Sequence, residues 1–122
     1  MRVLIVDDSS FVREYLRHLL DQMGIACEEA SNGHTALNML TDNHEFDLML
    51  LDVNMPGMSG IECMTAIRQT NLQPAMKVMM VTTEADSLFI ARALDSGADE
   101  FLVKPFTPEN LHEKMMIMGL PA

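Results

Sequence analysis

The sequence is poor in several residue types on which many function classes depend. Its 122 residues include no tryptophan, only 2 cysteines, and 8 lysines and arginines against 18 aspartates and glutamates. The formal net charge of -10 repels nucleic acid phosphates and anionic membrane surfaces, so we expect neither as a partner. Cys27 and Cys63 lack metal-ligand spacing and fall in separate expected elements, which favours free buried thiols over a disulfide.

Long apolar runs and nucleotide-binding motifs are also absent. The run from Val3 to Val6 stops at Asp7, far short of a signal peptide, and no later run is long enough to cross a bilayer. We therefore expect a cytoplasmic protein. No glycine-rich phosphate loop is present, so nucleotide binding is unsupported. Four histidines without ligand pairing are expected at the surface, which argues against a transition metal site: His18, His34, His44 and His112.

What the sequence does contain is a regular alternation of apolar runs and segments of helical periodicity. The runs indicate strands at residues 3–6, 25–30, 46–52, 76–81 and 100–103. Helices are indicated at residues 11–23, 60–69 and 86–96, after the turn at 31–33, and from 107 onward. This alternation predicts a single α/β domain over residues 1–122, with a doubly wound, five-stranded parallel sheet and five helices. Of the two common doubly wound strand orders, we assume the flavodoxin-like order 2-1-3-4-5.

The third of these strands carries the strongest functional signal. Apart from Asp47, residues 46–51 show no polar alternation, which is typical of a central strand covered on both faces. The run ends on Asp52, and residues 55–57 (Met-Pro-Gly) then turn the chain out of the sheet. Ligands bind beyond the carboxyl ends of parallel strands, so Asp52 lies where a site is expected. The alternative from position alone is an aspartate that caps the strand and faces water.

With the order 2-1-3-4-5, other polar side chains meet Asp52 at the same edge. The neighbouring strands end at Asp7 and Asp8, at Thr82, and at Lys104. Each pair of carboxylates a few Å apart repels by about 4 kcal/mol at an effective dielectric constant near 20, and a divalent cation offsets that repulsion. Mg²⁺ is the natural ion, because it prefers hard oxygen ligands. An aspartate beside Mg²⁺ and a lysine has the parts needed for phosphoryl transfer through an aspartyl phosphate.

These motifs allow a family resemblance to be stated. Asp7-Asp8, Asp52 followed by Met-Pro-Gly at 55–57, Thr82 and Lys104-Pro105-Phe106 resemble the response regulator receiver domain of two-component systems, over essentially the whole chain. The chain ends soon after its fifth helix, so it is most similar to stand-alone, CheY-like regulators. The resemblance implies that Asp52 is the phosphoacceptor. It also implies a signalling switch rather than an enzyme, although one that catalyses its own phosphorylation and dephosphorylation.

The resemblance also assigns the metal ligands and the residues that tune the phosphoaspartate. It implies that Mg²⁺ is bound by Asp8, Asp52 and the backbone carbonyl of Asn54, with Asp7 acting mainly through water molecules on the metal. Asn54 and Glu84 lie where such regulators tune hydrolysis of the phosphoaspartate. The alternative for these two residues is an ordinary place in a loop and a helix cap.

Three further roles follow from the same resemblance. Lys104 is implied to contact the phosphoryl group, and the peptide bond between Lys104 and Pro105 to be cis. Thr82 is implied to be the hydroxyl that moves on phosphorylation, and Phe101 the aromatic ring whose burial changes with it. A phenylalanine lacks the phenol of many relatives, so coupling through a hydroxyl hydrogen bond is not expected here.

The helix expected at 86–96 suggests a contact surface. If Ile90, Ala91 and Leu94 face the core, helical steps of about 100° place Leu88 and Phe89 off that face, where they form a partner surface together with the strand that contains the switch aromatic. Single exposed apolar side chains are common on proteins, so the alternative is that they have no partner.

The resulting functional hypothesis is a receiver that a sensor histidine kinase phosphorylates and that then binds a downstream target, with a phosphatase as an optional further partner. The pathway is expected to be of the chemotaxis or motility type. Two alternatives stay open: a phosphorelay intermediate that passes phosphate between histidines, and a receiver domain excised from a longer regulator. A hydrolase is unsupported, because the sequence offers no general base beside the acid cluster.

Overall fold

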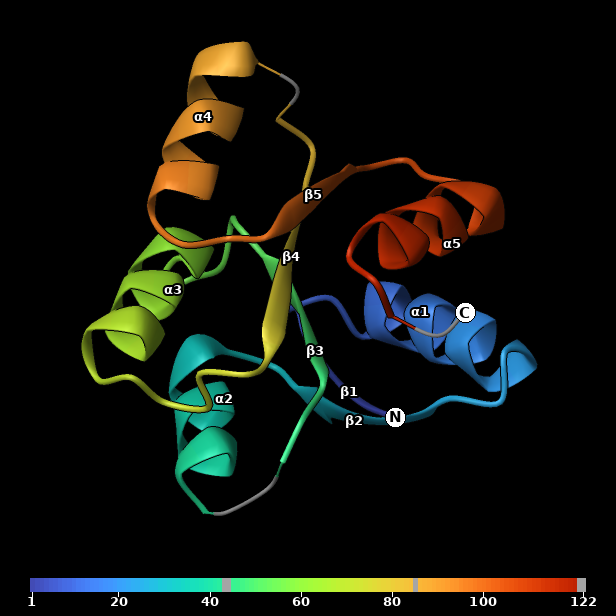
Figure 1. Ribbon diagram of the computed structural model, residues 1–122, viewed down its shortest axis with the longest axis horizontal. Helices are drawn as coiled ribbons and strands as arrows, with labels where there is room; N and C mark the ends of the chain where they lie inside the picture. Colours follow the sequence, from blue (N-terminus) through green and yellow to red (C-terminus); the bar gives the residue numbers. More distant parts are fainter. Residues whose placement is uncertain (43–44, 85, 121–122) are drawn as a thin grey trace.

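The computed structural model describes residues 1–42, 45–84 and 86–120. Strands and helices alternate along the whole of this part of the chain (Figure 1). The strands are β1 (Arg2–Val6), β2 (Ala26–Ala30), β3 (Leu48–Asp52), β4 (Lys77–Thr82) and β5 (Glu100–Val103). The helices are α1 (Ser10–Gln22), α2 (Gly33–Thr41), α3 (Gly60–Gln69), α4 (Ser87–Asp95) and α5 (Pro108–Ile117). Every predicted element is present, and most boundaries differ from the prediction by one or two residues.

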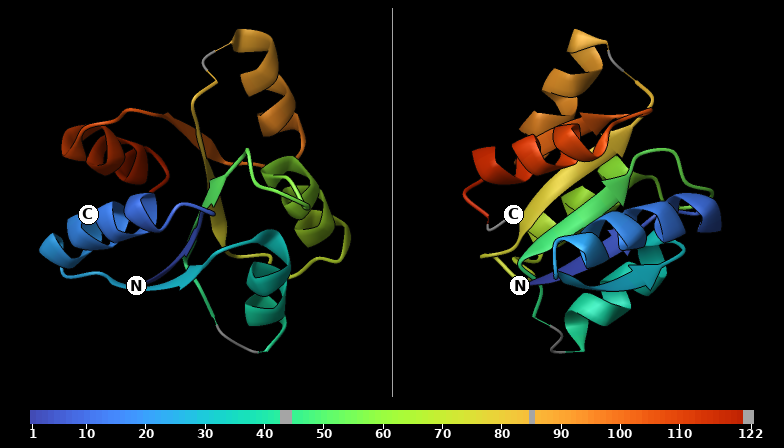
Figure 2. Two further views of the ribbon diagram at one scale, coloured as in Figure 1. Left: turned by 180° about the vertical axis from the view of Figure 1, so that it is seen from behind. Right: turned by 90° about the vertical axis from the view of Figure 1, so that its right-hand side faces the viewer.

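The strands form one parallel sheet in the order β2-β1-β3-β4-β5. Helices α1 and α5 cover one face, and α2, α3 and α4 cover the other (Figures 1 and 2). This is the predicted doubly wound fold, in which the sheet order reverses direction beside β1 and leaves the carboxyl ends of the strands facing one edge.

Burial of the central strands explains why they lack polar alternation. All five residues of β3 are buried, and β1 and β4 are exposed only at their first residue. Apolar side chains from alternate positions of these strands enter two separate clusters, one under α2, α3 and α4 and the other under α1 and α5. The edge strands β2 and β5 contain mostly half-buried residues, because each has a neighbouring strand on one side only.

The predicted orientation of α4 is wrong. Ala91 is exposed and Leu94 is 39% exposed, although both were expected to face the core, while Ala93 is buried. Phe89, expected at the surface, is half-buried and packs against the cluster under α2, α3 and α4. Of the proposed surface pair, only Leu88 is exposed, with 75% of its surface accessible to solvent. Apolar residues occupy several sides of this helix, so its spacing alone does not fix the buried side.

Two smaller expectations also need correction. Cys63 is buried, but Cys27 is half-buried because it lies on edge strand β2; both thiols are free. His18 and His34 are exposed as expected, while His112 is half-buried beside the core residues of α5.

The expectation for His44 lies outside the described residues. Within the described ranges, no helix combines the length and the apolar character needed to cross a membrane.

Candidate functional site

Ionisable and hydroxyl side chains from four strands meet at the carboxyl edge of the sheet. Asp52 is the last residue of β3 and Thr82 the last residue of β4. Asp7 directly follows β1, and Lys104 directly follows β5. The paired register of β3 with β4 and of β4 with β5 brings these strand ends level with one another. The structure therefore brings these strand-end side chains together at the edge where the sequence placed them.

Three carboxylates form an acid cluster, which consists of Asp7, Asp8 and Asp52. One oxygen from each lies within 4.8 Å of the others. Asp7 and Asp52 are buried, while Asp8 is exposed. Hard carboxylate oxygens that open to solvent on one side match the ligand preference of Mg²⁺, which keeps several water molecules. The donor set thus fits the ion that the sequence suggested, and these three residues would hold it.

Lys104 lies between the two buried acids. Its Nζ donates to Asp7 Oδ2 at 3.1 Å and to Asp52 Oδ1 at 3.4 Å. Burial, together with the charge of Asp7, raises the pKa of Asp52 to about 6, although Lys104 and the backbone N–H of Asn54 oppose the change. Burial lowers the pKa of Lys104, but the hydrogen bond to Asp7 and the two negative charges outweigh it and raise that pKa. Three carboxylates thus lie around a single lysine at this edge.

The first residue of α3, Gly60, approaches β3 so closely that only glycine fits there. A Cβ atom at Gly60 would lie 2.3 Å from the backbone oxygen of Asp52. The Gly60 N–H donates to the Val53 carbonyl at 2.9 Å, and the helix start is fixed by a capping box between Ser59 and Glu62. This packing determines where the loop after Asp52 leaves the sheet.

Thr82 is buried, and its Oγ1 accepts a hydrogen bond from the Glu84 N–H at 2.9 Å. Phe101, on the neighbouring strand β5, is half-buried and packs against the cluster under α2, α3 and α4. The Lys114 ammonium lies 4.2 Å from the centre of the Phe101 ring and also pairs with Glu100 at 3.2 Å. The Phe101 ring is therefore held in a cation–π contact at the surface of α5.

The remaining predicted site residues lie in the loops around this edge. Asn54 and Glu84 are both exposed. The peptide bond between Lys104 and Pro105 is cis, as the resemblance implied. Leu88 lies in the first turn of α4 and is exposed.

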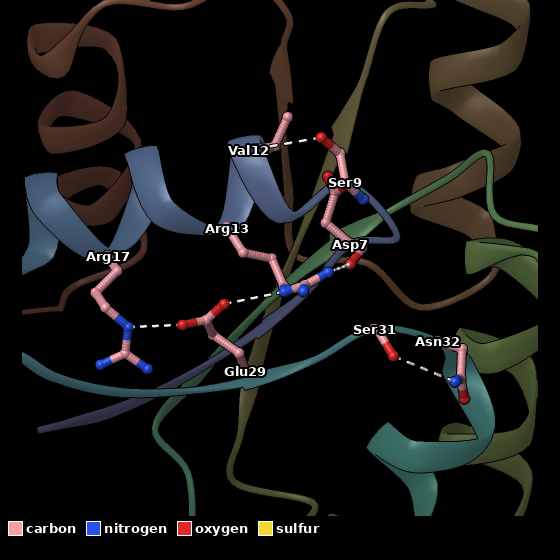
Figure 3. Close-up of polar contacts among 8 residues, drawn as sticks. All are labelled: Asp7, Ser9, Val12, Arg13, Arg17, Glu29, Ser31 and Asn32. Carbon is pink, nitrogen blue, oxygen red and sulfur yellow. Dashed lines mark hydrogen bonds and ion pairs between the residues drawn. The ribbon is translucent and has the colours of Figure 1, made fainter.

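Sequence reasoning missed an ion-pair network that reaches Asp7 of the acid cluster (Figure 3). Arg13 Nη1 donates to the backbone oxygen of Asp7 at 2.7 Å, and Arg13 Nε donates to Glu29 Oε1 at 2.9 Å. Arg17 Nε donates to the other carboxylate oxygen of Glu29 at 2.7 Å. The available signal was two arginines four residues apart on one helix face, opposite a glutamate on the adjacent strand.

The fold and this edge of the sheet define a class of protein. The sequence model of the response regulator receiver domain matches residues 3–116, and the chain belongs to this family.

Among its relatives is the chemotaxis protein CheY of Pseudomonas aeruginosa, 41% identical over 116 residues, a match that covers 94% of this chain and 93% of the relative. The CheY homolog of Campylobacter jejuni is 37% identical over 116 residues, or 94% and 89% of the two chains. Among solved structures, chemotaxis protein CheY4 of Vibrio cholerae superposes with a TM-score of 0.88 at 35% identity and covers 95% of this chain and 96% of its own. A CheY-like receiver domain from Methanospirillum hungatei superposes with a TM-score of 0.85 at 32% identity, and the match covers 96% of this chain and 91% of that domain.

Proposed function

We propose that this receiver accepts a phosphoryl group on Asp52 from a phosphohistidine of a sensor histidine kinase. The observation that carries the proposal is the placement of Asp52: a buried carboxylate at the end of a central strand, 3.4 Å from an ammonium group and beside two further acids. Membership of the receiver domain family supports the same assignment.

The proposed reaction is a displacement at phosphorus. A carboxylate oxygen of Asp52 attacks the phosphorus atom, the bond from phosphorus to the imidazole nitrogen breaks, and the leaving imidazole takes up a proton from solvent. Lys104 lies beside the attacking oxygen and neutralises charge on the transferred group. Mg²⁺, held by the acid cluster and the backbone carbonyl of Asn54, would supply further charge neutralisation. The Thr82 hydroxyl, whose oxygen already accepts the Glu84 N–H, donates a hydrogen bond to an oxygen of the phosphoryl group.

The kinase would approach beside Lys104, where an apolar groove borders the reaction centre. The groove is lined by Phe11, Val12, Tyr15, Lys104, Pro105 and Phe106. Phe11 is 77% exposed, and it lines the groove together with Tyr15 and Phe106; a group of solvent-accessible apolar side chains of this kind is typical of a contact surface. A docked donor domain would cover it and exclude water from the transferred group.

The output of the switch would be the face formed by α4, β5 and α5. When Thr82 moves toward the phosphoryl group, it changes the space available to Phe101 on the paired strand. The target would contact Phe101 and the exposed Leu88, while the half-buried Phe89 contributes its accessible edge. Asn54 and Glu84, exposed beside the site, would set how long the phosphoaspartate lasts.

The names of the relatives indicate chemotaxis as the pathway. We therefore propose a chemotaxis-type signalling switch with a kinase, a target and a phosphatase as partners. Its chemistry acts on its own aspartate and not on a separate substrate.

The test is phosphorylation by a small donor followed by intact mass measurement. Wild-type protein with Mg²⁺ and phosphoramidate or acetyl phosphate is expected to gain one phosphoryl group, and Asp52→Asn to gain none, because an amide cannot attack phosphorus. Equal labelling of both proteins would place the nucleophile elsewhere. The lifetime of the phosphoprotein, with and without a histidine phosphotransfer protein, then separates a switch from a relay intermediate.

A further inference from the structure

The network of Arg13, Arg17 and Glu29 joins helix α1, strand β2 and the turn that follows β1 (Figure 3). Glu29 lies on edge strand β2, paired with Ile5 of β1. Side chains alternate between the faces of a strand, and Cys27, two residues earlier, packs in the cluster under α1 and α5. Glu29 therefore points to the α1 side, where it meets both arginines. This places a carboxylate on the edge strand within reach of the turn that begins α1.

Both guanidinium groups donate to Glu29, but only that of Arg13 also contacts Asp7. Arg13 bridges from Glu29 to the Asp7 carbonyl, whereas Arg17 contacts the other Glu29 oxygen. The Arg13 side chain is 16% exposed and that of Arg17 40%. Burial raises the pKa of Glu29, but the hydrogen bonds from Arg17 and Arg13 outweigh it and lower that pKa. Glu29 is thus a charged, fixed anchor for Arg13.

The bond from Arg13 completes the fixation of the turn between β1 and α1. The Asp7 N–H donates to the Ala30 carbonyl at 3.2 Å, and Asp7 Oδ1 accepts the Ser9 N–H at 2.9 Å. The Asp7 carbonyl belongs to the peptide unit that leads into Asp8, so its tilt sets the direction of the next side chain. Within the described ranges, no hydrogen bond or ion pair holds the exposed Asp8 carboxylate.

We propose that Arg13 is a positioning residue for the metal site: anchored by Glu29, it fixes the Asp7–Asp8 peptide and so aims the Asp8 carboxylate at the cluster. The inference rests on the proposed function, because it concerns the proposed Mg²⁺ ligands. Groups that orient metal ligands without touching the metal contribute about 10- to 100-fold to metal affinity in well-studied sites. Arg13 acts through the backbone, so we expect the lower end of that range.

The sign of the effect separates positioning from simple electrostatics. Arg13 is a cation near a site for a dication. Its removal would strengthen Mg²⁺ binding if charge alone mattered. Loss of orientation predicts weaker binding instead. Arg17 offers a matched control, because it has the same charge and the same carboxylate partner but makes no contact with Asp7.

The experiment measures the dissociation constant of Mg²⁺ by titration calorimetry at fixed ionic strength for wild type, Arg13→Met and Arg17→Met. We expect about tenfold weaker binding in Arg13→Met and unchanged binding in Arg17→Met. Hydrogen exchange of the Asp8 amide in metal-free protein is expected to accelerate in Arg13→Met only. Arg13→Lys is measured in parallel as a second variant at position 13, in case Arg13→Met does not fold. It keeps the positive charge but lacks the planar guanidinium group, and it is expected to bind Mg²⁺ less tightly than wild type.

The outcomes that overturn the inference are distinct from failure of the proposed function. If wild type binds Mg²⁺ and neither position 13 variant binds it more weakly than Arg17→Met does, the positioning role is refuted while the metal site stands. Equal weakening in Arg13→Met and Arg17→Met also refutes it, because the effect would then be one of charge or of general stability. If wild type binds no Mg²⁺, the proposed metal site itself fails, and the inference fails with it.

Discussion

The unbalanced charge at the acid cluster predicts that Asp52→Asn stabilises the metal-free protein. The pKa of Asp52 is raised from 3.8 to about 6 by burial and by Asp7. At about 1.4 kcal/mol for each pKa unit, the ionised carboxylate destabilises the fold by about 2 to 3 kcal/mol at neutral pH. Asparagine has nearly the same shape and no charge. For a domain of this size, we expect its melting temperature to exceed that of wild type by about 10 °C in EDTA.

The same pKa change fixes the pH dependence of this difference. Between pH 3.8 and about 6, folded Asp52 binds more protons than unfolded Asp52, so the stability of wild type falls as the pH rises through this window. The asparagine variant lacks this titration. The difference in unfolding free energy should therefore shrink to about 1 kcal/mol when the pH is lowered to about 4.5.

Thermal melts of both proteins in EDTA at several pH values, read by circular dichroism, provide the measurement. Asp8→Asn is the matched control: it also removes one carboxylate, but Asp8 is exposed, so only a small change is expected. Adding Mg²⁺ should stabilise wild type and narrow its difference from Asp52→Asn, with NaCl at the same ionic strength as the screening control. Equal melting temperatures near neutral pH, or a difference that stays constant down to about pH 4.5, would refute the reasoning.

Two further substitutions test the site from other directions. Lys104→Met removes the cation between Asp7 and Asp52 and should slow phosphorylation by a small donor about 10²- to 10³-fold, as loss of a stabilising group in an active site does; an unchanged rate would exclude the proposed contact with the phosphoryl group. Gly60→Ala forces a methyl group against the Asp52 carbonyl and should destabilise the fold by about 1 to 3 kcal/mol. Its urea midpoint should fall, and a wild-type midpoint would show that α3 is not held as closely as described.

Much of the fold was predictable because local signals and global packing agree here. The apolar run that ends on Asp52 predicted the central strand and its last residue correctly. A strand covered on both faces is apolar at every position, so its sequence shows no helical periodicity that would favour another element. Helix α3 and strand β5 have the predicted boundaries. The predicted orientation of helix α4 was wrong because apolar residues on several of its sides left its buried side undetermined; the buried residue is the small Ala93.

The candidate site was predictable in its strand ends but not in its support. Once the sheet order is assumed, the residues that follow β1, β3 and β5 must meet at one edge. The contact of Arg13 with Glu29 depends instead on how α1 is placed over edge strand β2, which the spacing of the two arginines does not determine. The raised pKa of Asp52 likewise depends on burial, which the sequence shows only indirectly.

Edge strand β2 also bears on how the molecule meets others of its kind. A free sheet edge can accept a strand from a second copy and start aggregation. Here Glu28 and Glu29 point to opposite faces of that edge strand, and each is paired with an arginine of its own chain. A strand added at this edge would lie beside charged side chains on both faces, which an apolar strand from another chain does not favour. The charged pairs on β2 therefore protect the sheet against growth from its β2 edge.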